Sequence, residues 1–260
     1  MKVRMRFIKR GPIQYIGHLD LMRYFQKVFR RCGLDVAYSQ GFNPHQILSF
    51  ASPLGVGLTS IGEYLDAGIG SLRVITDENK KELTADEWVR RINKYSNDMV
   101  IVTSFNIMPD DTKPSMALLA AASYAVSFKN PDAAKDITGY YNNNSDIVFE
   151  KKTKKSVKEI NLKDGIYIVS DNAADYYKRV GSISKTDIEY EQKYIDMMEC
   201  RNPLYILCSS GSSLNIKPEM LIDAYGKSTG NEAGDYDIIR LDMYSSDGSV
   251  YESMSCGEVL

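Results

Sequence analysis

The clearest pattern of apolar and polar positions lies in residues 17–33. Apolar side chains recur there at spacings of four, three and four, which places them on one face of a helix. They are Leu21, Phe25, Val28 and Cys32. A second face carries basic side chains: Arg23, Lys27, Arg30 and Arg31. The pattern predicts a helix with a core face and a cationic face, which begins with an imperfect capping box (Gly17 and Asp20) and ends at Gly33.

The first half of the chain follows the element order βαββαβ. Residues 2–9 alternate apolar and basic side chains, which predicts a strand with one buried face and one basic face that carries Arg4 and Arg6. Thr84 and Glu87 predict a capping box that opens a second helix. Further strands are expected near 46–52, 61–69 and 99–108. This order is typical of a ferredoxin-like fold, an antiparallel sheet with both helices on one face.

The second half of the chain repeats this element order with extra strands. A polar, proline-containing break at 110–115 predicts a domain boundary, which gives domains 1–110 and 111–260. Asn130 and Pro131 predict the start of a helix that runs to about residue 141, and the basic run at 151–158 predicts an exposed hairpin tip. A short helix is expected at 218–225, and strands are expected at 124–129, 146–151, 157–162, 166–170, 186–198, 203–209 and 236–244. We therefore expect an α+β protein with two ferredoxin-like (βαββαβ) units in tandem, the second with extra strands and an acidic tail.

Charge is distributed unevenly along the chain. Residues 1–50 contain nine Lys and Arg against two Asp, a balance of +7, so the overall charge of −2 leaves −9 for the rest. A basic N-terminal half with an acidic tail favours a polyanionic ligand held at one place. One alternative stays open: these charges could belong to ordinary solvated surfaces, because most surface charges on proteins have no binding role.

Composition excludes several classes of protein. Hydrophobic residues make up 43% and charged residues 25% of the chain, as in ordinary globular domains. No apolar run approaches the roughly 18 residues of a membrane span. The four cysteines form neither CxxC nor the CxxxCxxC triplet of a radical enzyme's iron–sulfur cluster. We expect a cytoplasmic protein with free thiols, no cofactor and no membrane partner.

The segment after the predicted helix carries groups suited to contacts with unpaired bases. Tyr38 and Phe42 offer aromatic rings, and the neighbouring polar groups belong to Ser39, Gln40, Asn43 and His45. An ordinary structural turn is the alternative, because Gly41 allows a positive φ and Asn43 can bond its own backbone. A weaker anion site is expected at Lys217, where Pro218 opens a helix. That pattern is also common in ordinary loops.

His18 and His45 are the only histidines of the chain. With Asp20 they could contribute to a metal site, although no HxH, HxxxH or HExxH spacing supports one. They could also act as general acid and base in metal-independent RNA cleavage. Neutral histidines that hydrogen-bond the 39–45 loop and fix its shape are the third interpretation, and the one we favour.

Two long segments, GPIQYIGHLDLMRYFQKVFRRCGL and AYSQGFNPHQILSFASPLGVG, resemble the N-terminal signature of a radical-SAM-linked bacterial family. The segments VKEINL (157–162) and GSSLNIKPEML (211–221) resemble its later motifs. The resemblance implies a domain that is fused to, or encoded beside, a radical SAM protein. One departure is Gly17, where the family pattern has serine, so a hydroxyl cap at that position is not expected.

These observations predict an accessory protein without enzymatic activity. It would bind RNA (tRNA or rRNA, not DNA), or present a substrate to a radical SAM partner protein. The cationic helix face would bind phosphates and the 38–45 segment would read or stack a base. Two alternatives stay open: a ribonuclease that uses His18 and His45, and a scaffold whose basic face docks the partner.

Overall fold

A computed structural model describes residues 1–76, 81–152, 157–248 and 250–254. The chain folds into two compact units: unit 1 contains Met1–Leu119 and Met254, and unit 2 contains Ala120–Ser253. Helices and mostly antiparallel strands occur in both units, so the expected α+β class is confirmed. Residues 111–119, which the expected boundary placed in the second domain, belong to unit 1. Within the described residues no helix has the length and apolar content needed to cross a bilayer.

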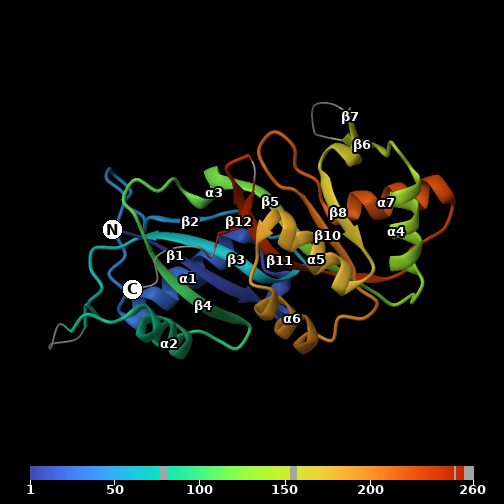
Figure 1. The fold of residues 1–260 in the computed structure, drawn as a ribbon. Helices are drawn as coiled ribbons and strands as arrows, with labels where there is room; N and C mark the ends of the chain where they lie inside the picture. The colour runs from blue at the N-terminus through green and yellow to red at the C-terminus, as the bar shows by residue number, and fades with distance from the viewer. Residues whose placement is uncertain (77–80, 153–156, 249, 255–260) are drawn as a thin grey trace. The chain divides into compact units, whose positions relative to one another are not determined.

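Unit 1 contains a sheet with the strand order β4-β1-β3-β2 (Figure 1). Its strands are β1 (Lys2–Lys9), β2 (Leu48–Phe50), β3 (Thr59–Gly68) and β4 (Val100–Met108), and each neighbouring pair is antiparallel. Helix α1 (His18–Cys32) follows β1, and α2 (Ala85–Tyr95) follows β3. Two short helices, η1 (Gly11–Tyr15) and α3 (Ser115–Leu118), flank these elements.

The core of unit 1 forms where α1 and α2 pack on one face of the sheet. The predicted apolar stripe of α1 is buried, and Phe25 contacts the β1 ring of Phe7 with 4.8 Å between ring centroids. Trp88 of α2 is fully buried against Phe105 of β4. The capping box of α2 is confirmed: the Glu87 amide donates to Thr84 Oγ1 at 3.3 Å, and the Thr84 amide donates to Glu87 Oε2 at 2.9 Å.

The expected basic face of β1 is wrong, because both faces of the strand are buried. Arg4 and Arg6 are each 3% exposed and Lys9 is 1% exposed. The Arg4 guanidinium binds the Asp66 carboxylate of β3 through Nε at 2.7 Å and Nη2 at 3.2 Å. Lys9 Nζ donates to the Gln14 and Ile16 carbonyl oxygens at 3.3 and 3.2 Å, which fixes the turn before α1. These cations stabilise the fold and offer no surface to a polyanion.

The main strands of unit 2 follow the order β11-β5-β10-β8. They are β5 (Leu119–Phe128), β8 (Ile166–Ser170), β10 (Leu204–Ser209) and β11 (Tyr236–Ser246). The helices are α4 (Ala133–Asn143), α5 (Ala173–Ile183), α6 (Ile188–Met197), α7 (Pro218–Thr229) and the short η2 (Leu162–Asp164). Strand β12 (Tyr251–Ser253) pairs with β11 and with β9 (Ser184–Lys185).

A separate hairpin of unit 2 joins β6 (Val148–Lys152) to β7 (Val157–Asn161). The two strands were expected from sequence, whereas the basic tip at 153–156 lies outside the described residues. The expected strand at 186–198 is wrong, because this segment forms α6. Glu191 and Ile195, four residues apart, both point inward, and Asp187 caps the helix by accepting the Tyr190 amide at 3.0 Å. Helix α4 begins at Ala133, later than Asn130 and Pro131 predicted.

Candidate functional site

Helix α1 carries the four predicted cations on its exposed face. Arg23, Lys27, Arg30 and Arg31 are all exposed, opposite the buried stripe. The helix ends at Gly33, whose φ of +75° is the left-handed conformation of a C-cap, and a Cβ there would lie 2.8 Å from Val74 Cγ1. Arg91 Nε of α2 donates to the Cys32 carbonyl oxygen at 2.5 Å, which satisfies one of the free carbonyls of the last turn.

Among the residues that the structure describes, most of this cationic face has no acidic partner. Arg23 pairs with Asp20 at 3.1 Å, but both side chains are more than 60% exposed, so water weakens the attraction. In the part of the chain that the structure describes, no carboxylate forms an ion pair with Lys27, Arg30 or Arg31. The helix therefore presents positive charge that an anionic ligand could neutralise.

The segment after α1 forms an exposed hairpin, defined here as residues 36–48. Tyr38 and Gln46 form an antiparallel bridge, and the Ile47 amide donates to the Ala37 carbonyl oxygen at 2.8 Å. The hairpin lies at the end of β3, where the Gly68 amide donates to the Ile47 carbonyl oxygen at 3.0 Å. At its tip, Gln40, Gly41, Phe42, Asn43 and Pro44 are exposed, and the Phe42 ring is fully exposed. A single exposed ring is common on protein surfaces, so Phe42 by itself indicates no function.

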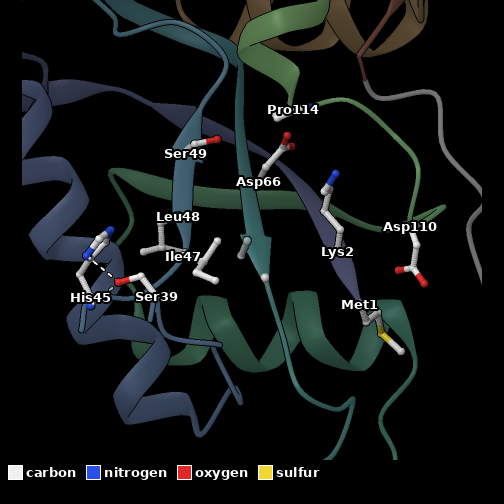
Figure 2. A pocket seen from close by; sticks show the side chains of 12 residues that line it. Met1, Lys2, Ser39, His45, Ile47, Leu48, Ser49, Asp66, Asp110 and Pro114 are labelled. Atoms are coloured by element: carbon white, nitrogen blue, oxygen red, sulfur yellow. Dashed lines mark hydrogen bonds between the residues drawn. The ribbon is translucent and has the colours of Figure 1, made fainter. Parts of the chain in front are cut away.

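His45 and Ser39 lock the base of the hairpin tip (Figure 2). Ser39 Oγ lies 2.9 Å from His45 Nδ1 and accepts the His45 amide at 3.1 Å, and the Ser39 amide donates to the His45 carbonyl oxygen at 2.8 Å. His45 thus hydrogen-bonds the loop, as the third interpretation of the histidines expects. Gly41 has a φ of +119°, a conformation that favours glycine at the turn.

His18 lies in a different environment. It is the first residue of α1, and its ring packs edge-on against Phe50 with 5.1 Å between centroids. No hydrogen bond or ring contact among the described residues joins His18 to His45. Nor do the described residues contain a group of three or more His, Cys, Asp or Glu side chains arranged to hold a metal ion. Burial raises the pKa of the Cys32 thiol, which marks it as a core residue rather than a nucleophile.

Chain connectivity holds the cationic face and the hairpin close together. Gly33, Leu34 and Asp35 alone separate the last turn of α1 from Val36, which bridges to Ile69. Four residues span at most about 14 Å, so Arg30 and Arg31 lie near the base of the hairpin. Lys217, in contrast, lies in unit 2 at the exposed N-cap of α7, which has no side-chain cap.

Two further cations were missed from the sequence. Arg90 and Lys94 are exposed on α2, on the side away from buried Trp88 and Ile92. Helix α2 is tied to α1 through Tyr24, whose hydroxyl lies 2.7 Å from Ser96 Oγ. Their helical spacing opposite an apolar stripe was visible in the sequence and could have identified them. The helix layer of unit 1 is therefore more basic than α1 alone.

Taken together, unit 1 offers cations for phosphate groups and exposed rings and amides for bases. A comparison with curated proteins finds no match for the chain. A family model does match residues 2–202, which include α1 and the hairpin. Because this match covers most of the chain, the protein belongs to the family described as "Uncharacterized protein conserved in bacteria (DUF2344)".

Proposed function

We propose that this protein is a non-enzymatic accessory that binds single-stranded RNA through unit 1. One observation carries the proposal: unpaired cations on α1 adjoin a hairpin whose tip holds a fully exposed phenylalanine. Cations bind the backbone of any nucleic acid, and exposed rings stack on unpaired bases. The combination fits an RNA loop or end better than a duplex, whose bases are already stacked.

Each part of the site has a separate energetic role. Four phosphate contacts from Arg23, Lys27, Arg30 and Arg31 would make affinity salt-dependent, with a log–log slope of about −3 for a single strand. Stacking on Phe42 would contribute about 1–3 kcal/mol, a factor of roughly 5 to 150 in affinity. The amide groups of Gln40 and Asn43 would read base edges beside that ring.

We also propose that both units have the ferredoxin-like topology. In unit 1 the strands β1, β2, β3 and β4 lie in the order 4-1-3-2, and β1, β3 and their neighbours are antiparallel. In unit 2 the strands β5, β8, β10 and β11 take the same order by sequence rank. On this interpretation the β6–β7 hairpin and the helices α5 and α6 are insertions.

The resemblance to radical-SAM-linked proteins supports a partner protein that carries out the chemistry. In this proposal the accessory holds the RNA, and the radical SAM enzyme modifies it. The protein would then act in the cytoplasm, where tRNA and rRNA are found. Recovery of a radical SAM enzyme with the full chain from cells, before and after nuclease treatment, would test whether RNA or direct contact joins the two.

A charge-reversal experiment tests the RNA proposal. The variant R23E/K27E/R30E should lose at least about 100-fold in affinity for single-stranded RNA at low salt. A matched control, K135E/K158E/K178E, changes the net charge equally at exposed positions of unit 2. It should keep most of the affinity. The variant F42A should bind roughly 5- to 150-fold more weakly while keeping the salt dependence. Equal losses in both triple variants would show that overall charge alone governs binding.

A further inference from the structure

A pocket of about 530 Å³ lies in unit 1, on the face of the sheet that carries the Arg4–Asp66 pair and faces away from the core under α1 and α2. Lys2, Ser49 and Asp66 are among the residues that line it (Figure 2). Strands β1, β2 and β3, the hairpin and the segment 110–114 all contribute side chains to it. This volume is within the usual range for small-molecule sites, which is about 300–1,000 Å³. The RNA proposal makes no use of most of these side chains.

The wall of the pocket is held in place by the buried Arg4–Asp66 pair. Both carboxylate oxygens of Asp66 accept hydrogen bonds from the Arg4 guanidinium, and Oδ2 also accepts one from the Ser115 amide at 2.7 Å. Arg4 donates in addition to the Lys113 carbonyl oxygen at 3.4 Å. These bonds fix the segment that carries Pro114 against β3, so this side of the pocket is preformed.

The pocket holds two opposite charges, on Lys2 and Asp110. Lys2 is half-buried, and its ammonium donates to the Thr112 carbonyl oxygen, which leaves its full charge. Asp110 is exposed at the rim. In the described part of the chain neither Lys2 nor Asp110 forms an ion pair. Because Arg4 already neutralises Asp66, the pocket offers one positive and one negative group to a ligand.

Between these charges and the far end of the pocket lies an apolar surface. Figure 2 shows Lys2 and Asp110 on one side, Ser39 and His45 on the other, and Ile47 between them. Ile47 is 47% exposed, a large fraction for an isoleucine that lines a pocket. A ligand with an apolar body would cover it and gain the free energy of that burial.

We propose that this pocket binds a free α-amino acid with a bulky apolar side chain. The carboxylate of the ligand binds Lys2, its ammonium group binds Asp110, and its side chain packs on Ile47. A dianion such as a phosphate ester fits poorly, because Lys2 balances only one negative charge and the Asp110 carboxylate would repel the second. A simple amine would leave Lys2 without a partner. The zwitterion satisfies both charges at one end and the apolar surface beyond them.

The test is calorimetric titration of the full chain, tagged only at its C-terminus because Met1 and Lys2 line the pocket. The probes are L-leucine, L-phenylalanine and L-methionine, with N-acetyl-L-phenylalanine and phenethylamine as analogues that each lack one charge. At least one amino acid should bind, and L-phenylalanine should bind about tenfold or more tightly than either of its two analogues. Equal binding of the N-acetyl analogue, or no binding of any amino acid, would overturn the proposal.

Variants locate the site. K2Q and D110N should each weaken amino-acid binding by about tenfold or more. K2R keeps the positive charge, so it should bind the amino acid more tightly than K2Q does. S49F should fill the pocket and abolish binding, and an unchanged unfolding transition of Trp88 fluorescence would show that unit 1 still folds. K135Q, in unit 2, should bind as the wild type does. Unchanged affinity in both K2Q and D110N would place any binding elsewhere and refute the assignment.

Discussion

Replacing Asp66 by alanine should destabilise unit 1 by about 4 kcal/mol or more. The substitution leaves the Arg4 guanidinium buried at 3% exposure without its carboxylate. Removing one partner of a buried ion pair costs about 3–5 kcal/mol. The Ser115 amide also loses its acceptor, which adds about 1–3 kcal/mol if no water replaces it. Since a domain is stable by only about 5–15 kcal/mol, this loss is a large fraction of the total.

The single tryptophan makes the effect measurable in unit 1 alone. Trp88 is fully buried in the core of that unit, so its fluorescence follows the unfolding of unit 1 even if unit 2 unfolds separately. With a urea m-value of about 2 kcal/mol per molar, a loss of 4 kcal/mol lowers the midpoint by about 2 M.

An exposed ion pair on α1 provides the matched control. Arg23 and Asp20 are 69% and 63% exposed, so D20A should change the free energy of unfolding by no more than about 0.5 kcal/mol. The double variant R4M/D66L replaces the buried pair with apolar side chains and should recover much of the loss. If D66A cost less than about 1 kcal/mol, as little as D20A, the structural role assigned to the pair would be wrong.

Two further predictions concern a helix cap and a buried tyrosine. T84A removes the acceptor of the Glu87 amide and should destabilise unit 1 by about 1 kcal/mol in the Trp88 transition, whereas a change below about 0.3 kcal/mol would contradict the capping role. Burial raises the pKa of Tyr205 in unit 2 to about 12, above the value of about 10 in an unfolded chain. The unfolded state therefore releases the Tyr205 proton at a lower pH than the folded state. Below about pH 10 the stability that this tyrosine contributes is fully present. Between about pH 10 and pH 12 that contribution should fall by at most about 2.7 kcal/mol. In urea titrations followed by circular dichroism, Y205F should lose less stability than the wild type between these two pH values, and equal losses would contradict the assignment.

Local patterns in the sequence predicted the elements of unit 1 well. The stripe from Leu21 to Cys32 and the Thr84–Glu87 capping box depend on residues within one or two helical turns, which a sequence shows directly. The burial of Arg4 could not be predicted in this way. Its partner, Asp66, is far away in the sequence, and only the pairing of β1 with β3 brings them together.

Local sequence patterns also predicted part of the candidate site. The cations of α1 and the exposed ring of Phe42 follow from helical periodicity and from the turn residues around Gly41. The pocket did not follow from sequence, because Lys2 and Asp110 line one pocket only after β1 and β4 pair in the folded sheet. In unit 2, residues 186–198 were misassigned because the alternation of Ile188, Tyr190 and the acids between them resembles a strand, whereas burial follows the helical spacing of Glu191 and Ile195.

The salt dependence of RNA binding tests the central claim most directly. For nuclease-treated protein and a single-stranded tRNA or rRNA fragment, the logarithm of the affinity should fall with the logarithm of salt concentration at a slope of about −3. The R23E/K27E/R30E variant should reduce the magnitude of this slope by about two, while K135E/K158E/K178E should leave it near the wild-type value. A wild-type slope near zero, or the same slope in all three proteins, would contradict the assignment of the α1 face as the phosphate-binding surface.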